Sequence, residues 1–428
     1  MKKKTIQSFF ILTFSVSLAK LFNILNRMIL ARQLGEEGLG LYMLMMPTLG
    51  LWVILSQMSI PSAIFKLVAD KRYNNKKVMI SGFIMTMLTT FLFMGIFLLL
   101  LPIFPTQILK NENTALPLRA LFVFVPLTSL SALLKNYYLG KKMHQVTLKT
   151  QISEEVVRLL FTFYFLERFI EATLSFKVAL LFIAMALGEL ASIIHLLFYV
   201  KGKVHFQQDT FDIPYFHDLF KISFPLTGSR LLHCLTSFLE PIIITRILLH
   251  LGYTSLMIQK EYGMMNGYVL SMITMPTFLT TVIYRLVLPE FLESMHHKKR
   301  IRKILFLSLL ICLIIALPFT YLFYQYPEIC LQLLYKTTHG SSYLKYLSIP
   351  FILYYLQTPF NALLQALDKH KTLFFISFIE CFLEIMLLLI LTPHFHILAM
   401  AITLLIGIVV TLVLSVLACF HFLFFDKK

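Results

Sequence analysis

Five basic residues lie within long apolar stretches of the sequence, where a charged side chain has little water to solvate it. They are Lys20, Arg27, Lys66, Arg230 and Arg285. An ionisable side chain near the centre of a membrane helix costs about 2.5–3.5 kcal/mol on insertion scales. Basic side chains that face a shared cavity would bind an anion, and phosphate is the first candidate. Lys66 and Arg285 lie near the ends of their stretches, so contact with lipid headgroups is an alternative for these two.

Carboxylates also lie inside the apolar stretches. Glu154 and Arg158 are four residues apart, which places them on one face of a helix, with Glu155 beside them. Glu380 lies within a later stretch. We expect these four residues to form gating pairs or a site of coupling to H⁺ or Na⁺, although Glu154 and Arg158 could instead form an ion pair that only holds the fold. Glu189 is interpreted as a packing or helix-contact residue outside the site.

Groups suited to other chemistry are sparse. No Walker-type phosphate loop occurs, and no Ser, His and Asp residues have a spacing that argues for catalysis. The five cysteines are scattered among apolar residues without metal-ligand spacing, which is typical of packing residues. We therefore predict a protein that is not an enzyme and has no cofactor and no metal site.

Twelve apolar stretches carry these residues. Apolar residues make up 58% of the 428 residues and charged residues 14%, against roughly 25% charged in soluble domains. Because a membrane helix needs about 20 mostly apolar residues, we predict an all-α, polytopic membrane bundle of about twelve transmembrane helices. The first stretch is too long for a signal-peptide core, so it is interpreted as an uncleaved span. The stretches cover residues 6–30, 41–65, 78–101, 117–139, 146–167, 174–200, 215–249, 258–288, 303–325, 343–366, 371–392 and 396–422.

Lysine and arginine alternate between rich and poor gaps along the chain. The rich gaps include residues 71–77, 141–142, 201–203, 298–303 and 369–371, and with twelve spans they all fall on one side. The positive-inside rule makes that side the cytoplasm and places both termini there, in a cytoplasmic-membrane protein. The net charge of +17 is therefore explained by loops, and nucleic acid is not an expected partner.

The two halves of the chain resemble each other weakly. Lys20 corresponds to Arg230 and Glu154 to Glu380, with offsets between about 210 and 230 residues. We predict two pseudo-symmetric six-helix lobes, residues 1–200 and 214–428. Six spans per half give both lobes the same orientation, and in such transporters the substrate site lies between the halves.

Four segments carry a resemblance to a known family. They are RMILARQLGEEGLGLY at 27–42, IPSAIFKLVA at 60–69, QISEEVVR at 151–158 and LQTPFNALLQAL at 356–367. In this order they make the chain similar to the stage V sporulation protein B group of the multidrug/oligosaccharidyl-lipid/polysaccharide exporter superfamily, whose relatives include lipid II flippases. The resemblance implies a two-lobed bundle, alternating access and a cationic central cavity, with Lys20 at a basic cavity position. Many relatives have fourteen spans, whereas twelve are predicted here.

The resulting hypothesis is a flippase for a polyprenyl-diphosphate-linked saccharide of peptidoglycan or another polysaccharide. Membrane lipids and the lipid-linked saccharide are its expected partners, and a cell-wall polymerase is a candidate. The main alternative is an ion-coupled multidrug antiporter of the same fold, which would need a cavity dominated by acidic residues. A membrane-embedded transferase would need a catalytic residue in a sizeable outer loop, and the outer gaps are short. A purely structural partner would have no use for the repeated intramembrane charges.

Overall fold

The computed structural model describes residues 3–70, 72–200, 213–295 and 297–424, and these residues form helices and short connections without a β-strand. Eight helices are long and apolar enough to cross a membrane, and one bent pair of helices adds a ninth candidate. Each of the twelve predicted stretches lies mostly on helices, and three of them, 41–65, 258–288 and 343–366, are divided between two or more helices. The prediction of an all-α polytopic bundle is therefore confirmed.

The helices divide into two compact units, Met1–Phe238 and Leu239–Lys428, each of which is described by itself. The boundary lies inside one long helix, α7 (Ile213–His250). The predicted lobe boundary falls in the segment 201–213, most of which lies outside the described residues. The division into lobes 1–200 and 214–428 stays a prediction.

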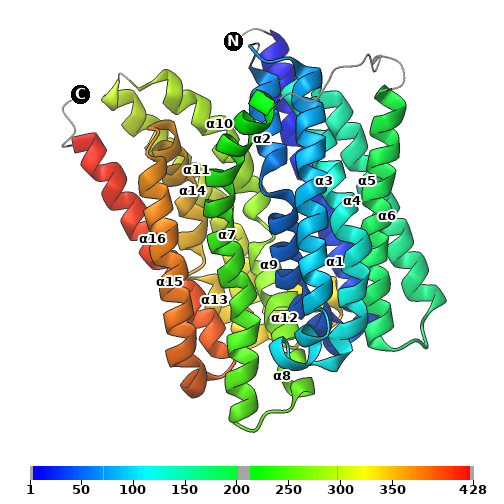
Figure 1. Ribbon diagram of the computed structural model, residues 1–428. Helices are drawn as coiled ribbons and strands as arrows, with labels where there is room; N and C mark the ends of the chain where they lie inside the picture. Colours follow the sequence, from blue (N-terminus) through cyan, green and yellow to red (C-terminus); the bar gives the residue numbers. More distant parts are fainter. Residues whose placement is uncertain (1–2, 71, 201–212, 296, 425–428) are drawn as a thin grey trace. The chain divides into compact units, whose positions relative to one another are not determined.

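Unit 1 is a bundle in which α5 and α6 pack on each other, α4 packs on α6, and α1 packs on α3 and α5 (Figure 1). Long runs of apolar residues favour insertion into a membrane. No water is available there to bond the backbone, and a helix satisfies each backbone group within its own segment. The helices of this unit are α1 (Lys3–Gln57), α2 (Ile60–Ala69), α3 (Asn75–Leu100), α4 (Ala115–Gly140), α5 (His144–Arg168), α6 (Leu174–Val200) and the first part of α7.

The first two predicted stretches differ from the observed helices in their boundaries. A single helix, α1, contains the first stretch and most of the second, and the backbone is non-helical at Gly35, with φ 64° and ψ −169°. Glycine adopts this conformation without the steric penalty that a Cβ atom imposes. A second break follows at Met58 and Ser59, where φ is again positive, and α2 begins at Ile60.

Unit 2 contains more interrupted helices than the sequence predicts. The predicted stretch 258–288 comprises α8 (Ser255–Tyr262), a π-helix (Gly263–Val269), α9 (Leu270–Thr274) and α10 (Thr277–Glu293). The chain bends by 44° between Thr274 and Thr277, on either side of Pro276. Proline lacks the N–H group that would continue the helical hydrogen bonds, which explains the bend. The remaining helices are α11 (Lys298–Gln325), α12 (Pro327–Tyr335), α13 (Ser341–Ser348), α14 (Ile352–Ala366), α15 (His370–Phe395) and α16 (Leu398–Phe424).

Candidate functional site

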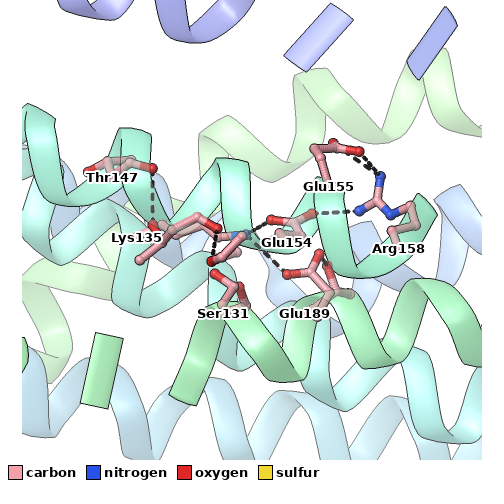
Figure 2. Close-up of polar contacts among 12 residues, drawn as sticks. Ser131, Lys135, Thr147, Glu154, Glu155, Arg158 and Glu189 are labelled. Carbon is pink, nitrogen blue, oxygen red and sulfur yellow. Dashed lines mark hydrogen bonds and ion pairs between the residues drawn. The ribbon is translucent and has the colours of Figure 1, made fainter. Parts of the chain in front are cut away.

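Five ionisable side chains on three neighbouring helices of unit 1 form one connected group, which we call the charge network (Figure 2). Lys135 on α4 contacts Glu154 on α5 and lies 3.1 Å from Glu189 on α6. Arg158 Nη2 lies 2.5 Å from Glu154 Oε1, and Arg158 Nη1 lies 3.1 Å from Glu155 Oε2. Glu154 therefore joins the two cations, and the network ties α4, α5 and α6 together.

The network is buried, and it contains more acids than bases. Glu154 is 6% exposed, Glu155 5%, Glu189 7% and Arg158 9%. Lys135 and Arg158 are two cations facing three carboxyl groups. A buried charge is tolerated only when it is paired and hydrogen-bonded, and the Thr128 hydroxyl meets part of this demand by donating to Glu189 at 2.9 Å. The excess carboxyl is a position where a proton could balance the charge.

Helix geometry explains why the side chains meet. Glu154, Glu155 and Arg158 are related by three- and four-residue spacings, so they share one side of α5. Gly188 on α6 lets the two helices approach closely, since a Cβ atom there would lie 2.9 Å from the backbone oxygen of Glu154. Glu189, interpreted from the sequence as a packing or helix-contact residue, contacts Lys135 on α4 and thereby belongs to the network.

Sequence analysis missed the pairing that defines this network. Lys135 was not among the predicted site residues, although it lies inside an apolar stretch as the others do. The usable signal was the presence of charged residues well inside the fourth, fifth and sixth stretches. Sequence spacing identifies pairs within one helix, but the contact of Lys135 with Glu154 and Glu189 crosses three helices.

Changing Gly188 to alanine is expected to lower the thermal unfolding temperature (Tm). The new Cβ would lie 2.9 Å from the Glu154 backbone oxygen and 3.3 Å from the Arg158 Cβ, so α5 and α6 must move apart. Overpacking of this kind costs about 1–3 kcal/mol. Gly95→Ala is the matched control, because a Cβ on Gly95 meets open space. Equal Tm values for the two variants in detergent would contradict the close approach of the two helices.

A second group in unit 1 is cationic, and we call it the cationic face: Ser62, Lys66 and Arg230. Arg230 on α7 donates a hydrogen bond from Nη2 to the Ser62 hydroxyl on α2, at 3.1 Å. Lys66 lies one helical turn after Ser62, and both Lys66 and Arg230 are exposed. The fold thus brings two of the five predicted anion-binding residues, 164 positions apart in sequence, to one face.

The other three predicted anion-binding residues lie on α1 and α10. Arg27 is half-buried on α1 of unit 1, and Arg285 is half-buried on α10 of unit 2. Lys20 lies on α1, but its side chain is outside the described part of the structure. Whether these three share a site with the cationic face stays a prediction.

Unit 2 holds an acidic group. Glu380 and Glu384 are one turn apart on α15, and Glu384 is close enough to both Glu380 and Glu240 to interact electrostatically with each. Tyr262 and Asn266 lie within hydrogen-bonding reach of the Glu240 side chain. One Glu240 oxygen, Oε1, is buried without a hydrogen-bond partner. Glu380, predicted as a gating or coupling residue, is therefore part of a group of carboxyl groups.

Residues 5–295 match the family described as "Polysaccharide biosynthesis protein". Stage V sporulation protein B of Bacillus subtilis (strain 168) is 29% identical over 363 residues, which cover 82% of this chain and 70% of that protein.

Solved structures of transporters have similar folds. The lipid II flippase MurJ in an inward closed conformation gives a TM-score of 0.67 at 12% identity, covering 95% of this chain and 86% of MurJ. The MATE multidrug transporter DinF-BH, solved in complex with a ligand, gives a TM-score of 0.70 at 16% identity, covering 98% of this chain and 97% of that chain. At these identities the likeness concerns the fold alone. Together with the apolar helices, these relatives indicate a multi-pass membrane protein.

Proposed function

The chain belongs to the polysaccharide biosynthesis protein family, and we propose that it is a membrane transporter, a flippase for a polyprenyl-diphosphate-linked saccharide. The lipid would move from the cytoplasmic to the outer leaflet of the cytoplasmic membrane, with both termini of the protein in the cytoplasm. The observation that carries the proposal is the cationic face, where Arg230 and Lys66 are exposed on an apolar bundle.

The diphosphate is the part of such a lipid that the cationic face suits. Arg230 offers a planar set of donors that matches two phosphate oxygens, and Lys66 adds a compact charge one turn from Ser62. Arg27, Lys20 and Arg285 are proposed as further contacts to the diphosphate or the sugar. The polyprenyl chain needs only an apolar environment, which the surrounding membrane provides.

Transport against a gradient requires an energy source, and the two acidic groups are the candidates. We assign gating or coupling to Glu154, Glu155 and Arg158 in the charge network and to Glu380 in unit 2. The carboxyl group in excess in the charge network suits a proton, whereas the acidic group of unit 2 suits H⁺ or Na⁺. A cell-wall polymerase that consumes the flipped lipid is the proposed partner.

The alternative is an ion-coupled multidrug antiporter. The acidic group around Glu240, Glu380 and Glu384 favours it, because carboxylates attract organic cations. The similar fold of a MATE multidrug transporter points in the same direction. The exposed cations of unit 1 count against it.

Movement of a fluorescent polyprenyl-diphosphate disaccharide across vesicles distinguishes the two functions. With the chain reconstituted, we expect the label on both leaflets to become accessible to an external quencher, whereas protein-free vesicles expose only the outer label. The same lipid without its phosphates should move much less. Uptake of a fluorescent organic cation driven by an H⁺ or Na⁺ gradient, with no movement of the diphosphate lipid by the correctly inserted chain, would favour the antiporter.

A further inference from the structure

The beginning of α7 is attached to the turn between α2 and α3 by a small set of polar contacts, which we call the α7 latch. The Tyr73 hydroxyl donates to Asp218 Oδ2 at 3.0 Å. The Asn74 backbone N–H donates to the Tyr215 hydroxyl at 3.4 Å. Both contacts join residues more than 140 positions apart, so they hold the beginning of α7 against another part of unit 1.

Ring contacts surround these hydrogen bonds. The rings of Tyr73 and Tyr215 meet edge to face, with centroids 5.8 Å apart, and Lys77 Nζ lies 5.7 Å from the centre of the Tyr215 ring. Leu219, the residue after Asp218, is fully buried in the core formed with Ile60, Ile64 and other residues. The first turns of α7 therefore contact the core beside α2 through Leu219.

The latch differs from the charge network in how easily it can open. Tyr73, Tyr215 and Asp218 are only half-buried, so water can replace the bonds that they lose. A half-exposed hydrogen bond contributes little net stability because protein and water partners exchange. Separating the helices that carry the charge network would instead leave buried charges without partners, which costs much more. The latch is thus a contact that can release at low cost.

A second contact attaches α7 to α2 farther along the helix. Arg230 follows Asp218 by twelve residues, about 18 Å of helix rise, and donates to Ser62 at 3.1 Å. Ser62 is a neutral acceptor. A phosphate oxygen carries negative charge and forms a stronger bond to a guanidinium group. An anion that reaches the cationic face can therefore take Arg230 away from Ser62.

We propose that the α7 latch is controlled by the anion: binding at Arg230 breaks the contact with Ser62, loosens α7 on α2 and shifts the latch toward its released form. The inference rests on the proposed function only in treating the natural anion as a lipid diphosphate. A ligand shifts such an equilibrium because it binds one form better than the other. Here the released form binds better, since its guanidinium is not shared with Ser62. The cytoplasmic end of α7 would thus open when substrate arrives.

Cross-linking across the latch tests this proposal without requiring transport. The paired substitution Asn74→Cys/His217→Cys, at exposed positions beside Tyr73 and Asp218, keeps both latch hydrogen bonds because Asn74 contributes only its backbone N–H. The two thiols are joined in vesicles by a short thiol-reactive reagent with two reactive ends, and inorganic pyrophosphate is the probe. We expect pyrophosphate to slow cross-linking by about twofold or more, the effect of losing one modest hydrogen bond. The effect should disappear when Arg230→Gln is added, because the amide cannot bind the anion as a guanidinium does.

The control pair is Lys142→Cys/Gln145→Cys, two exposed positions at the turn between α4 and α5, whose cross-linking should not respond to pyrophosphate. Chains that carry only one of the two introduced cysteines measure how much of the cross-linking involves the five native cysteines. A joined latch should also stop transport of the diphosphate lipid, and a reductant that cleaves the reagent should restore it.

The outcomes separate the latch from the flippase proposal. If neither pyrophosphate nor the lipid changes the rate of cross-linking in a chain that transports the lipid, the latch proposal is wrong and the flippase proposal stands. A response to pyrophosphate that requires Arg230, in a chain that moves no diphosphate lipid, supports the latch and overturns the proposed substrate. Full transport by the joined pair would overturn the latch directly.

Discussion

Replacing Lys135 with methionine is expected to lower the free energy of unfolding by about 3–5 kcal/mol, the cost of removing one partner from a buried ion pair. Lys135 contacts both Glu154 and Glu189. Methionine keeps the apolar stem but removes the charge, so two buried carboxyl groups then depend on Arg158 and Thr128 for their contacts. The loss is measured as a fall in Tm in detergent and in the yield of folded protein.

A double substitution tests whether charge pairing causes this loss. Lys135→Met/Glu189→Gln removes one charge of each sign, and the glutamine oxygen can still accept the hydrogen bond of Thr128. We expect most of the lost stability to return. Lys149→Met, at an exposed position of the neighbouring helix α5, is the control and should change stability by less than about 0.5 kcal/mol. A double variant no more stable than Lys135→Met would contradict pairing.

The double substitution Lys66→Gln/Arg230→Gln is expected to reduce transport of the diphosphate lipid about 100-fold or more. Hydrogen bonds to charged groups contribute about 1.5–3 kcal/mol each, which corresponds to roughly 10–100-fold per residue at 1.4 kcal/mol per factor of ten. The two effects need not add, because both side chains face one anion. The initial rate of lipid movement in vesicles measures the change.

Two variants control this experiment. Arg230→Lys keeps the charge but loses the planar donors, so its rate should lie between those of the native chain and Arg230→Gln. Arg119→Gln removes an exposed positive charge from the first turns of α4, away from the cationic face, and should leave transport unchanged. If the double variant inserts normally and transports at the native rate, the cationic face does not bind the substrate.

The helical fold could be predicted from the sequence because membrane insertion imposes a length and an apolar composition on each span. The break at Gly35 and the π-helix at Gly263–Val269 could not be predicted in the same way. Both depend on local backbone conformations that packing against neighbouring helices selects. The bend near Pro276 was predictable because proline removes a backbone donor wherever it stands.

For the site, the sequence could predict contacts within one helix but not contacts between helices. Glu154, Glu155 and Arg158 are neighbours on one helix, so their spacing alone indicates the pairing. The contacts of Lys135 with Glu189 and of Arg230 with Ser62 join different helices. Such pairings depend on how helices pack and rotate, and no pattern in one sequence determines that.

The sharing of α7 between the two units has a consequence for how such a chain could arise by duplication. Leu219, which follows the predicted boundary of the first half, is fully buried in the core of unit 1 beside Ile64. A half-chain cut before α7 therefore lacks a piece of its own interior. Duplication of a segment that ends before α7 would leave the core of unit 1 without Leu219, whereas a segment that continues to Phe238 keeps it.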